Sequence, residues 1–188
     1  MVIEGTRRTQ TDRSTGTRSA LAEAAIDLLV ERGWAAVTAV EVCQRAGVSR
    51  GAFHHHYPTL AALLADALQH LYDDLADFDR PHPRDLAELI DRTWDSLREP
   101  RFKAVLEAWQ AMSNDPSLRA EIGPVVARFS QLVGADEVVA KQIVAKADLA
   151  TYFMAREALL GLAIGRATSG GRPLPHERAV LRRIKELT

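Results

Sequence analysis

The stretch AGVSRGAFHHHYP, residues 46–58, holds three consecutive histidines close behind an arginine, Arg50. An imidazole can ligate a metal ion, transfer protons near neutral pH, or donate a hydrogen bond to a phosphate oxygen. A metal site needs side chains that converge, but successive side chains of a helix point about 100° apart. Three adjacent histidines therefore cannot close on one ion, and no metal or other cofactor is expected.

Catalysis by these histidines would need a nucleophile or a carboxylate held against them in a cleft. Glu41 and Asp66 are the carboxylates that come into question for this role. The sequence has no paired carboxylates, Ser/His/Asp set, phosphate-binding loop or HExxH motif to support an enzyme. The third interpretation is a surface that faces a negatively charged partner, and the surrounding elements decide among the three.

Composition and charge limit the class of protein. The chain has 188 residues, 47% hydrophobic and 26% charged, with a net charge of −1. These values fit one globular domain of moderate size, or a small module attached to a larger one. The single cysteine, Cys43, excludes an internal disulfide and favours a reducing compartment. We find no signal peptide and no apolar run near the ~20 residues that span a bilayer, so a cytoplasmic protein without a membrane partner is expected.

The first elements are predicted to be three short helices. Residues 1–16 have almost no apolar content and are expected to form a disordered basic arm. The next helix runs over 17–32, because apolar residues recur on one face until Gly33. Thr38 and Glu41 form a capping box that predicts a second helix over 39–46. Gly47 ends it, Ser49 caps a third helix that reaches His56, and Pro58 marks the boundary.

About six longer helices follow. One runs from Thr59 to before residue 80, Pro83 opens the next, and Pro100 opens another. Asp115 and Pro116 start a helix in which Gly123–Pro124 predicts a break or kink. Residues 135–167 form one long helix or two in series, 168–175 form a loop, and 176–187 close the chain. Strand patterns and repeats are both absent from the sequence, so the predicted fold is all-α with about nine helices.

The two short helices joined by AGVS match a helix-turn-helix, in which glycine permits a tight turn and the second helix enters a groove. Phe53 and Tyr57 are expected to face a small core with Val42 and Val48. Arg50, Gly51, His54 and His55 then share the opposite surface. Such a surface can meet DNA, because arginine offers a donor fork and imidazoles donate to phosphates.

The segment TAVEVCQRAGVSRGAFHHHYPTLAALL resembles the N-terminal DNA-binding region of the tetracycline-repressor (TetR) family of bacterial transcription regulators. The resemblance covers about residues 17–64. The positions in register with the family pattern are Thr38, Ala46, Gly47, Val48, Ser49, Gly51, His56 and Tyr57. It implies a helix-turn-helix domain over 17–58 and an effector-binding and dimerisation domain over 59–188. In this family pattern Cys43 takes the place of a small buried residue, so a core thiol is expected rather than a redox sensor.

The resemblance also implies DNA-contact roles, position by position. The resemblance implies phosphate contacts for Thr38, Ser49, His55 and His56. It implies contacts towards the bases for Arg50, Gly51 and His54. Ala52 is also counted among the DNA-binding residues. Two positions depart from the pattern. His54 replaces a usual tyrosine, and Leu60 replaces a lysine that grips phosphate, which should weaken non-specific affinity. The arginines of the N-terminal segment are expected to compensate: Arg7, Arg8, Arg13 and Arg18.

The helices after residue 59 carry the expected effector and dimer residues. Core packing is the default for each large apolar side chain, but the family encloses an effector pocket here. The expected effector-binding residues are Trp94, Phe102, Glu107, Trp109, Met112, Phe129 and Phe153. Small residues recur in the penultimate helix and allow close helix contact. The family's two-fold interface implies a homodimer through 151–167 and 175–187, with Ala155, Ala158, Gly161, Gly165, Val180 and Ile184 at the contact.

These expectations combine into one leading function. We expect a sequence-specific, dimeric regulator of transcription that binds a palindromic operator. The expected mode of action is repression, with the protein released from DNA by a small-molecule effector. It is not expected to be an enzyme. The alternative is a helical ligand-binding or enzymatic protein that does not bind DNA, and a third reading is an architectural DNA binder without an effector.

Overall fold

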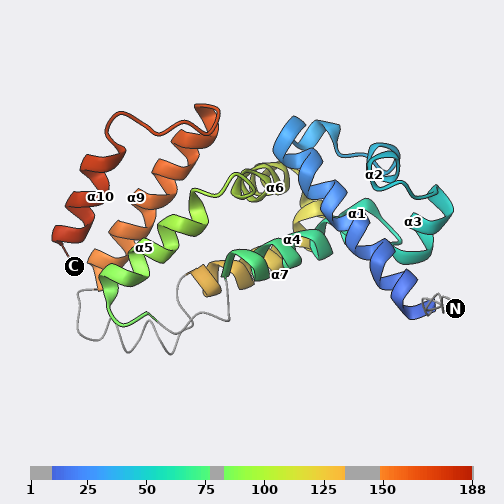
Figure 1. Cartoon of the computed structure of the whole chain (residues 1–188), viewed down its shortest axis with the longest axis horizontal. Coiled ribbons are helices and arrows are strands. Elements are labelled where there is room, and N and C mark those ends of the chain that lie inside the picture. Colours follow the sequence, from blue (N-terminus) through green and yellow to red (C-terminus); the bar gives the residue numbers. More distant parts are fainter. Residues whose placement is uncertain (1–9, 77–82, 134–148, 188) are drawn as a thin grey trace, which may run out of the picture.

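The computed structural model describes residues 10–76, 83–133 and 149–187, and every regular element in these ranges is helical (Figure 1). The nine α-helices of the described ranges agree with the all-α expectation. They are α1 (Gln10–Arg32), α2 (Ala39–Ala46), α3 (Arg50–His56), α4 (Leu60–Ala76), α5 (Leu86–Leu97), α6 (Phe102–Asn114), α7 (Pro116–Val133), α9 (Leu149–Thr168) and α10 (Glu177–Glu186). A single 3-10 turn, η1 (Trp34–Ala36), follows α1.

Helix α1 is the axis of the N-terminal half, and α2, α3, α4 and α6 all pack against it. Its predicted apolar face is buried as expected: Leu21, Ala24, Ala25, Leu28 and Leu29. The helix ends at Gly33, whose φ of 76° lies in the left-handed region that glycine adopts without strain. Helices α2 and α3 lie at one end of the molecule and α10 at the opposite end (Figure 1).

The start of α1 corrects the expected limits of the N-terminal arm. Residues 10–16 were expected to be disordered, but they form the first turns of α1. A helix that is already held by its packed apolar face adds residues cheaply, because only its nucleation is costly. The polar composition of this segment therefore does not prevent it from being helical. Residues 1–9, with Arg7 and Arg8, lie outside the described residues.

Helices α4, α6 and α7 form the middle of the molecule. Alanines at their contacts, including Ala67, Ala104 and Ala108, are fully buried and let the helices approach closely. The predicted start of α7 is confirmed, since Asp115 Oδ1 accepts the Ser117 and Leu118 amides at 2.9 and 3.1 Å. Of the predicted break or kink in this helix, the break is wrong, because the helix runs on through Pro124. Proline removes one hydrogen bond of the ladder, and the neighbouring turns keep theirs.

The C-terminal layer consists of α5, α9 and α10, with α9 between the other two in its contacts. Helix α5 begins at Leu86 rather than at Pro83, because Asp85 caps it by accepting the Glu88 amide at 2.8 Å. Similarly, α6 begins at Phe102, two positions after the predicted Pro100. Helix α9 supplies the described part of the predicted 135–167 helix, since 134–148 lie outside the described residues. No described helix combines the length and apolarity needed to cross a bilayer.

Candidate nucleic-acid interface

Helix α2 is started by the threonine that the sequence marked as its cap. Thr38 Oγ1 accepts the Glu41 amide at 3.2 Å. The reciprocal half of the predicted capping box is not formed, because the Glu41 carboxylate instead accepts a hydrogen bond from Arg32 at 3.1 Å. The Thr38 hydroxyl proton remains a donor, so this cap can also serve a phosphate oxygen.

The turn between α2 and α3 has the geometry of a helix-turn-helix. Gly47 ends α2 with a φ of 67°, and a Cβ there would meet no atom within 4 Å. The next amide, that of Val48, donates to the Cys43 carbonyl at 3.0 Å. Ser49 then starts α3, because its Oγ accepts the Ala52 amide at 3.1 Å. Both predicted caps and the predicted glycine turn are confirmed.

The buried side of α3 anchors the helix in the core. Phe53 and Tyr57 are 1% and 3% exposed, and their ring centroids lie 6.2 Å apart. Val42 is buried and Val48 is half-buried, so the expected core face is confirmed. Cys43 is also buried, and this burial raises the pKa of its thiol, as in a core cysteine.

The opposite side of α3 is open to solvent. Arg50, Gly51, His54 and His55 are exposed together, as their spacing predicts. A Cβ on Gly51 would meet only the Ser49 hydroxyl, at 3.8 Å, which leaves room for a close backbone approach. The Arg50 guanidinium makes no hydrogen bond or ion pair with side chains or backbone in the described part of the chain. A donor fork is therefore available on this face for an anionic or base-edge partner.

The three histidines differ in their surroundings. His54 lies edge-on against Phe53, with ring centroids 5.2 Å apart, and His55 lies edge-on against His56 at 5.1 Å. His56 is half-buried. Burial, with lesser contributions from His55 and Arg18, lowers the pKa of His56. Among the described residues no group of three or more potential ligands could hold a metal ion.

Arg18 was expected to support DNA binding, but it is committed to a contact inside the chain. Its Nη2 atom lies 2.9 Å from Asp66 Oδ1, and its guanidinium stacks over the Tyr57 ring at 5.4 Å. The Tyr57 hydroxyl donates a short hydrogen bond to the other oxygen of Asp66. This network joins α1, the end of α3 and α4. The Arg13 side chain lies outside the described residues.

The pKa shifts of Asp66 and Tyr57 agree with a strong contact between these two side chains. Burial raises the pKa of Asp66, but the hydrogen bonds from Tyr57 and Arg18 outweigh it, so the pKa lies below its ordinary value. Burial first, and then the Asp66 contact, raise the pKa of Tyr57 to about 12. Sequence reasoning weighed Asp66 only as a catalytic partner. A buried tyrosine hydroxyl needs a hydrogen-bond partner, and this requirement of Tyr57 was the signal that could have pointed to Asp66.

The expected effector residues are not gathered around one site in the described part of the chain. Trp94 is buried between α5 and α9, where the Arg166 guanidinium stacks over it at 5.7 Å. Phe102 is fully buried against Trp109, with ring centroids 6.0 Å apart, and the Trp109 Nε1 donates to the Tyr72 hydroxyl at 3.3 Å. The Trp109 indole therefore points towards α4.

Two further expected effector residues have other surroundings. Glu107 Oε2 accepts the Trp34 amide at 2.9 Å, so this carboxylate faces the end of α1. Phe153 is 44% exposed on α9 and lies against the Arg156 guanidinium. Helical spacing alone could not reveal that Glu107 faces the end of α1 or that Phe153 is exposed. Met112 is half-buried beside the core, and the Phe129 side chain lies outside the described residues.

The small residues of α9 divide between two faces. Gly161 is exposed, and a Cβ there would meet no atom within 4 Å. Ala158 is half-buried. Ala155 is buried inside the chain, and a Cβ on Gly165 would lie 2.6 Å from Leu174 Cδ1. Contrary to expectation, Ala155 and Gly165 therefore pack within their own chain.

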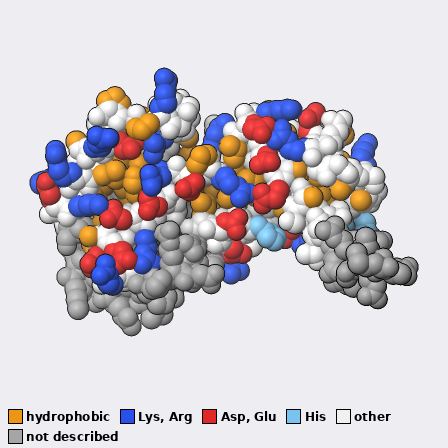
Figure 2. All heavy atoms as spheres, viewed as in Figure 1, with side chains coloured by type: hydrophobic (Ala, Val, Ile, Leu, Met, Phe, Trp, Pro, Cys, Tyr) orange, Lys and Arg blue, Asp and Glu red, His pale blue; other side chains and the backbone are white. Residues whose placement is uncertain are grey.

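A different set of α9 residues is exposed. The α9 apolar patch consists of Phe153, Met154, Gly161 and Ile164; Met154 is 55% exposed and Ile164 is 44% exposed. On α10, Val180 is half-buried and Ile184 is buried against its own chain. Figure 2 shows apolar side chains at the surface among arginines and lysines over α9 and α10. An exposed apolar surface of this kind is typical of a protein contact.

Comparison with known proteins locates the family relationship in the helix-turn-helix region. Residues 21–67 match the model of the family described as bacterial regulatory proteins, tetR family. The HTH-type transcriptional regulator CymR of Pseudomonas putida is 33% identical over 129 residues, which cover 65% of this chain and 64% of that protein. The match therefore spans less than two thirds of this relative.

Solved structures extend the likeness to the whole fold. A transcriptional regulator from Rhodococcus sp. Rha1 has a TM-score of 0.70 at 21% identity, covering 90% of this chain and 95% of that chain. The multidrug binding protein EbrR, complexed with imidazole, has a TM-score of 0.66 at 21% identity, covering 100% of this chain and 97% of its own. At this identity the likeness concerns the arrangement of the helices.

Proposed function

We propose that the chain is a member of the TetR family of bacterial regulatory proteins, whose model matches residues 21–67, and that it is a dimeric transcriptional regulator that binds a palindromic operator in the cytoplasm. The mode of action proposed is repression that is relieved by a small molecule. In this proposal residues 17–58 contact DNA, and 59–188 bind the effector and form the dimer. The family consists of regulators and not of enzymes.

The observation that carries the proposal is the open face of α3. The side that is buried, with Phe53 and Tyr57, fixes the helix rigidly, and the side that is exposed offers Arg50, Gly51 and His54. A recognition helix needs both properties, since its base contacts must be held in register by a stable core. Arg50 is the residue we assign to a base edge, because a guanidinium can donate two parallel hydrogen bonds to guanine.

The rim of this face supports contacts to phosphate. Thr38 and Ser49 accept backbone amides as helix caps and keep a hydroxyl proton to donate. His55 is exposed beside them, whereas His56 is half-buried and its lowered pKa favours the neutral ring. We therefore assign the stronger phosphate contact to His55 and a weaker one to His56. Ala52 lies on the same helix and is half-buried.

A second copy of the chain is proposed to cover the α9 apolar patch. One helix-turn-helix makes few contacts, and a dimer that reads two half-sites about 34 Å apart gains specificity. Gly161 is an exposed member of the patch, and the open space beside it allows another helix to approach its backbone. In this arrangement Val180 of α10 lies at the edge of the contact, and Ala158 contributes from its half-buried position.

An effector site is proposed beside α6. Trp109 and Met112 are half-buried on this helix and pack against the core that joins α4 to α7. A site there would offer an aromatic and a flexible apolar wall, which suit a small apolar or aromatic molecule. EbrR is a multidrug binding protein, and its likeness in fold supports an effector of this type without specifying it.

The test is fluorescence anisotropy with random duplex DNA at low salt, followed by selection of preferred fragments from random sequence. We expect binding that weakens steeply as salt is added, and selected fragments with two-fold symmetry. A protein that binds no duplex at low salt would favour the alternative, a helical ligand-binding or enzymatic protein. Selected fragments without symmetry would contradict the dimeric mode alone.

A further inference from the structure

The start of α6 grips the end of α1 through polar side chains. Glu107 Oε2 accepts the Trp34 amide at 2.9 Å, just past the last turn of α1. The contact depends on the glycine before it, because a Cβ at Gly33 would lie 3.0 Å from the same oxygen. One turn earlier on α6, Lys103 Nζ donates to the Val30 carbonyl at 2.6 Å. A carbonyl that the last turn of α1 leaves without an intrahelical partner, and the Trp34 amide at the start of η1, are thus both satisfied from α6.

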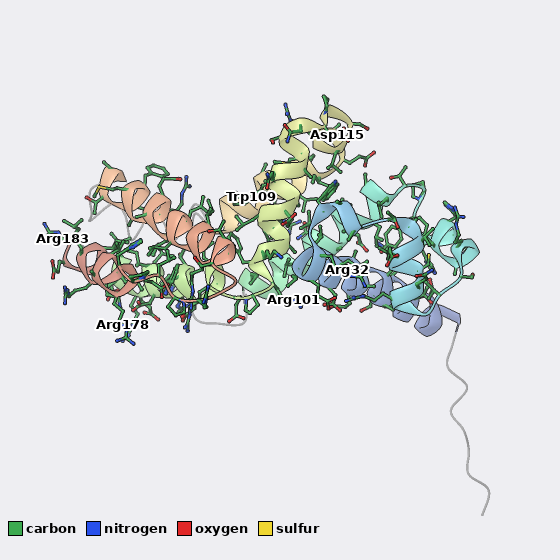
Figure 3. All side chains as sticks on the ribbon, turned by 90° about the horizontal axis from the view of Figure 1, so that it is seen from above. Arg32, Arg101, Trp109, Asp115, Arg178 and Arg183 are labelled. Atoms are coloured by element: carbon green, nitrogen blue, oxygen red, sulfur yellow. The ribbon has the colours of Figure 1, made fainter. Side chains whose placement is uncertain are left out.

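A third residue extends this contact to α4. The Arg101 guanidinium lies 2.7 Å from Glu23 of α1 and 3.5 Å from Asp74 of α4. Figure 3 labels Arg101 at the start of α6, Trp109 further along it, and Arg32 at the end of α1. These side chains are partly exposed, so the ion pairs add little to stability by themselves. The hydrogen bonds to the backbone fix a geometry more sharply.

The other half of α1 is fastened to the recognition helix. Arg18 pairs with Asp66, which accepts the hydroxyl of Tyr57 at the end of α3. Val30 and Arg18 are about 18 Å apart along the helix at 1.5 Å per residue. A rotation of about 10° at the α6 contact would therefore displace the α3 attachment by about 3 Å, which exceeds the tolerance of a hydrogen bond to a base edge.

We propose that Lys103 and Glu107 form an α6–α1 clamp that sets the orientation of the helix-turn-helix relative to the helices that bind the second copy. The inference rests on the proposed function, because it concerns a dimer that must present two recognition helices at a fixed spacing. Glu107 is a positioning residue and touches no DNA. Loss of the clamp leaves each α3 surface intact but frees its orientation, and the lost pre-organisation weakens binding to two half-sites.

The experiment compares two DNA duplexes, one with both half-sites of a sequence selected by the wild-type protein and one with a single half-site. Glu107→Ala removes the acceptor for the Trp34 amide, and Glu107→Gln keeps a neutral one. We expect Glu107→Ala to weaken binding to the two-site duplex on the order of tenfold, as for one hydrogen bond to a charged group. Binding to the single half-site should change less than about twofold, and Glu107→Gln should recover most of the affinity.

Two further variants complete the design. Lys103→Met should shift the two-site affinity in the same direction, and it carries the test if Glu107→Ala does not fold. Glu121→Ala is the matched control, because Glu121 is an exposed carboxylate on α7 that contacts no partner in the described part of the chain. Hydrogen exchange at the Trp34 amide reports the clamp directly and should accelerate in Glu107→Ala and not in Glu121→Ala.

The outcomes separate the inference from the proposed function. Unchanged or tighter two-site binding by Glu107→Ala overturns the clamp, as does an equal loss on both duplexes, which would indicate damage within the helix-turn-helix. A Glu107→Gln protein as weak as Glu107→Ala would also contradict a role based on accepting the Trp34 amide. If the wild-type protein binds neither duplex nor random DNA, the proposed function fails, and the clamp fails with it.

Discussion

Replacement of Tyr57 by phenylalanine should destabilise the protein and loosen the recognition helix. The ring of Tyr57 is 3% exposed and packs against Phe53, so Tyr57→Phe keeps the apolar contacts. What it removes is the hydroxyl that donates to Asp66. Since this bond closes the last turn of α3 against α4, its loss should be felt at the DNA-binding face.

The expected cost follows from the partners that remain. A hydrogen bond to a charged group contributes about 1.5–3 kcal/mol. The Asp66 side chain is 21% exposed and keeps its ion pair with Arg18, so water and the guanidinium replace part of the lost interaction. We therefore expect the free energy of unfolding to fall by about 1.5–2 kcal/mol, which corresponds to about 3–8 °C in melting temperature for a chain of this length.

The assay is urea unfolding of the wild type, Tyr57→Phe, Asp66→Ala and the double variant. The double-mutant cycle should give a coupling energy of about 1 kcal/mol or more. Tyr72→Phe is a matched control, because that hydroxyl accepts a hydrogen bond from the neutral indole of Trp109. Coupling near zero between Tyr57 and Asp66 would refute the reasoning.

The loss of unfolding free energy in Tyr57→Phe should also depend on pH, in a direction that the pKa of Asp66 determines. Because the folded-state pKa of Asp66 is lowered, its stabilising contribution is complete above the ordinary carboxylate pKa and is lost as pH falls through the folded value. The difference between wild type and Tyr57→Phe should therefore shrink below about pH 4. A cost for Tyr57→Phe that stays constant in acid would show that the charge of Asp66 is not involved.

Three further predictions concern DNA binding and assembly. Arg50→Ala should weaken binding to a selected duplex by about 1–3 kcal/mol and leave random-duplex affinity nearly unchanged, and equal losses would indicate a phosphate contact. Gly161→Arg should yield a folded monomer in light scattering, because the new side chain meets open space within its own chain. Ala158→Arg should also lower the melting temperature, because Ala158 is half-buried. A Gly161→Arg protein that stays dimeric would show that the α9 apolar patch is not the interface. The affinity for a selected duplex should rise as pH falls from about 8 to about 6. His55→Gln should reduce this rise more than His56→Gln, because the pKa of His56 is already lowered. An affinity that does not depend on pH argues against both phosphate contacts.

Local signals in the sequence predicted the helix-turn-helix well. A cap, a left-handed glycine and a proline act within a few residues, so Thr38, Gly47 and Ser49 define α2 and α3 without reference to the rest of the chain. The i, i+4 spacing of Phe53 and Tyr57 likewise determines which face of α3 is buried. The exposed set that contains Arg50 and His54 follows from the same periodicity.

The contacts between helices were harder to predict, because periodicity gives a face and not its partner. Glu107 was expected beside an effector and Arg18 on DNA, yet Glu107 accepts the Trp34 amide of η1 and Arg18 pairs with Asp66 of α4. Phe153 was assigned to a pocket because of its residue type, although its face of α9 is exposed. For Glu107 and Arg18 the partner is a backbone amide or a side chain that becomes available only after the helices have packed.

The Asp66 network and the α6–α1 clamp act at different levels and can be separated by the same two duplexes. Tyr57→Phe disturbs α3 within one helix-turn-helix, so it should weaken binding to a single half-site and to the two-site duplex alike. Glu107→Ala leaves α3 attached to α4 and should weaken only the two-site complex. Because the clamp reaches α3 through α1 and the Asp66 network, losing either attachment removes part of the benefit of the other, so the double variant should lose less two-site affinity than the sum of the two single losses. Additive losses would mean that the two contacts act independently and that α1 does not carry the orientation from α6 to α3.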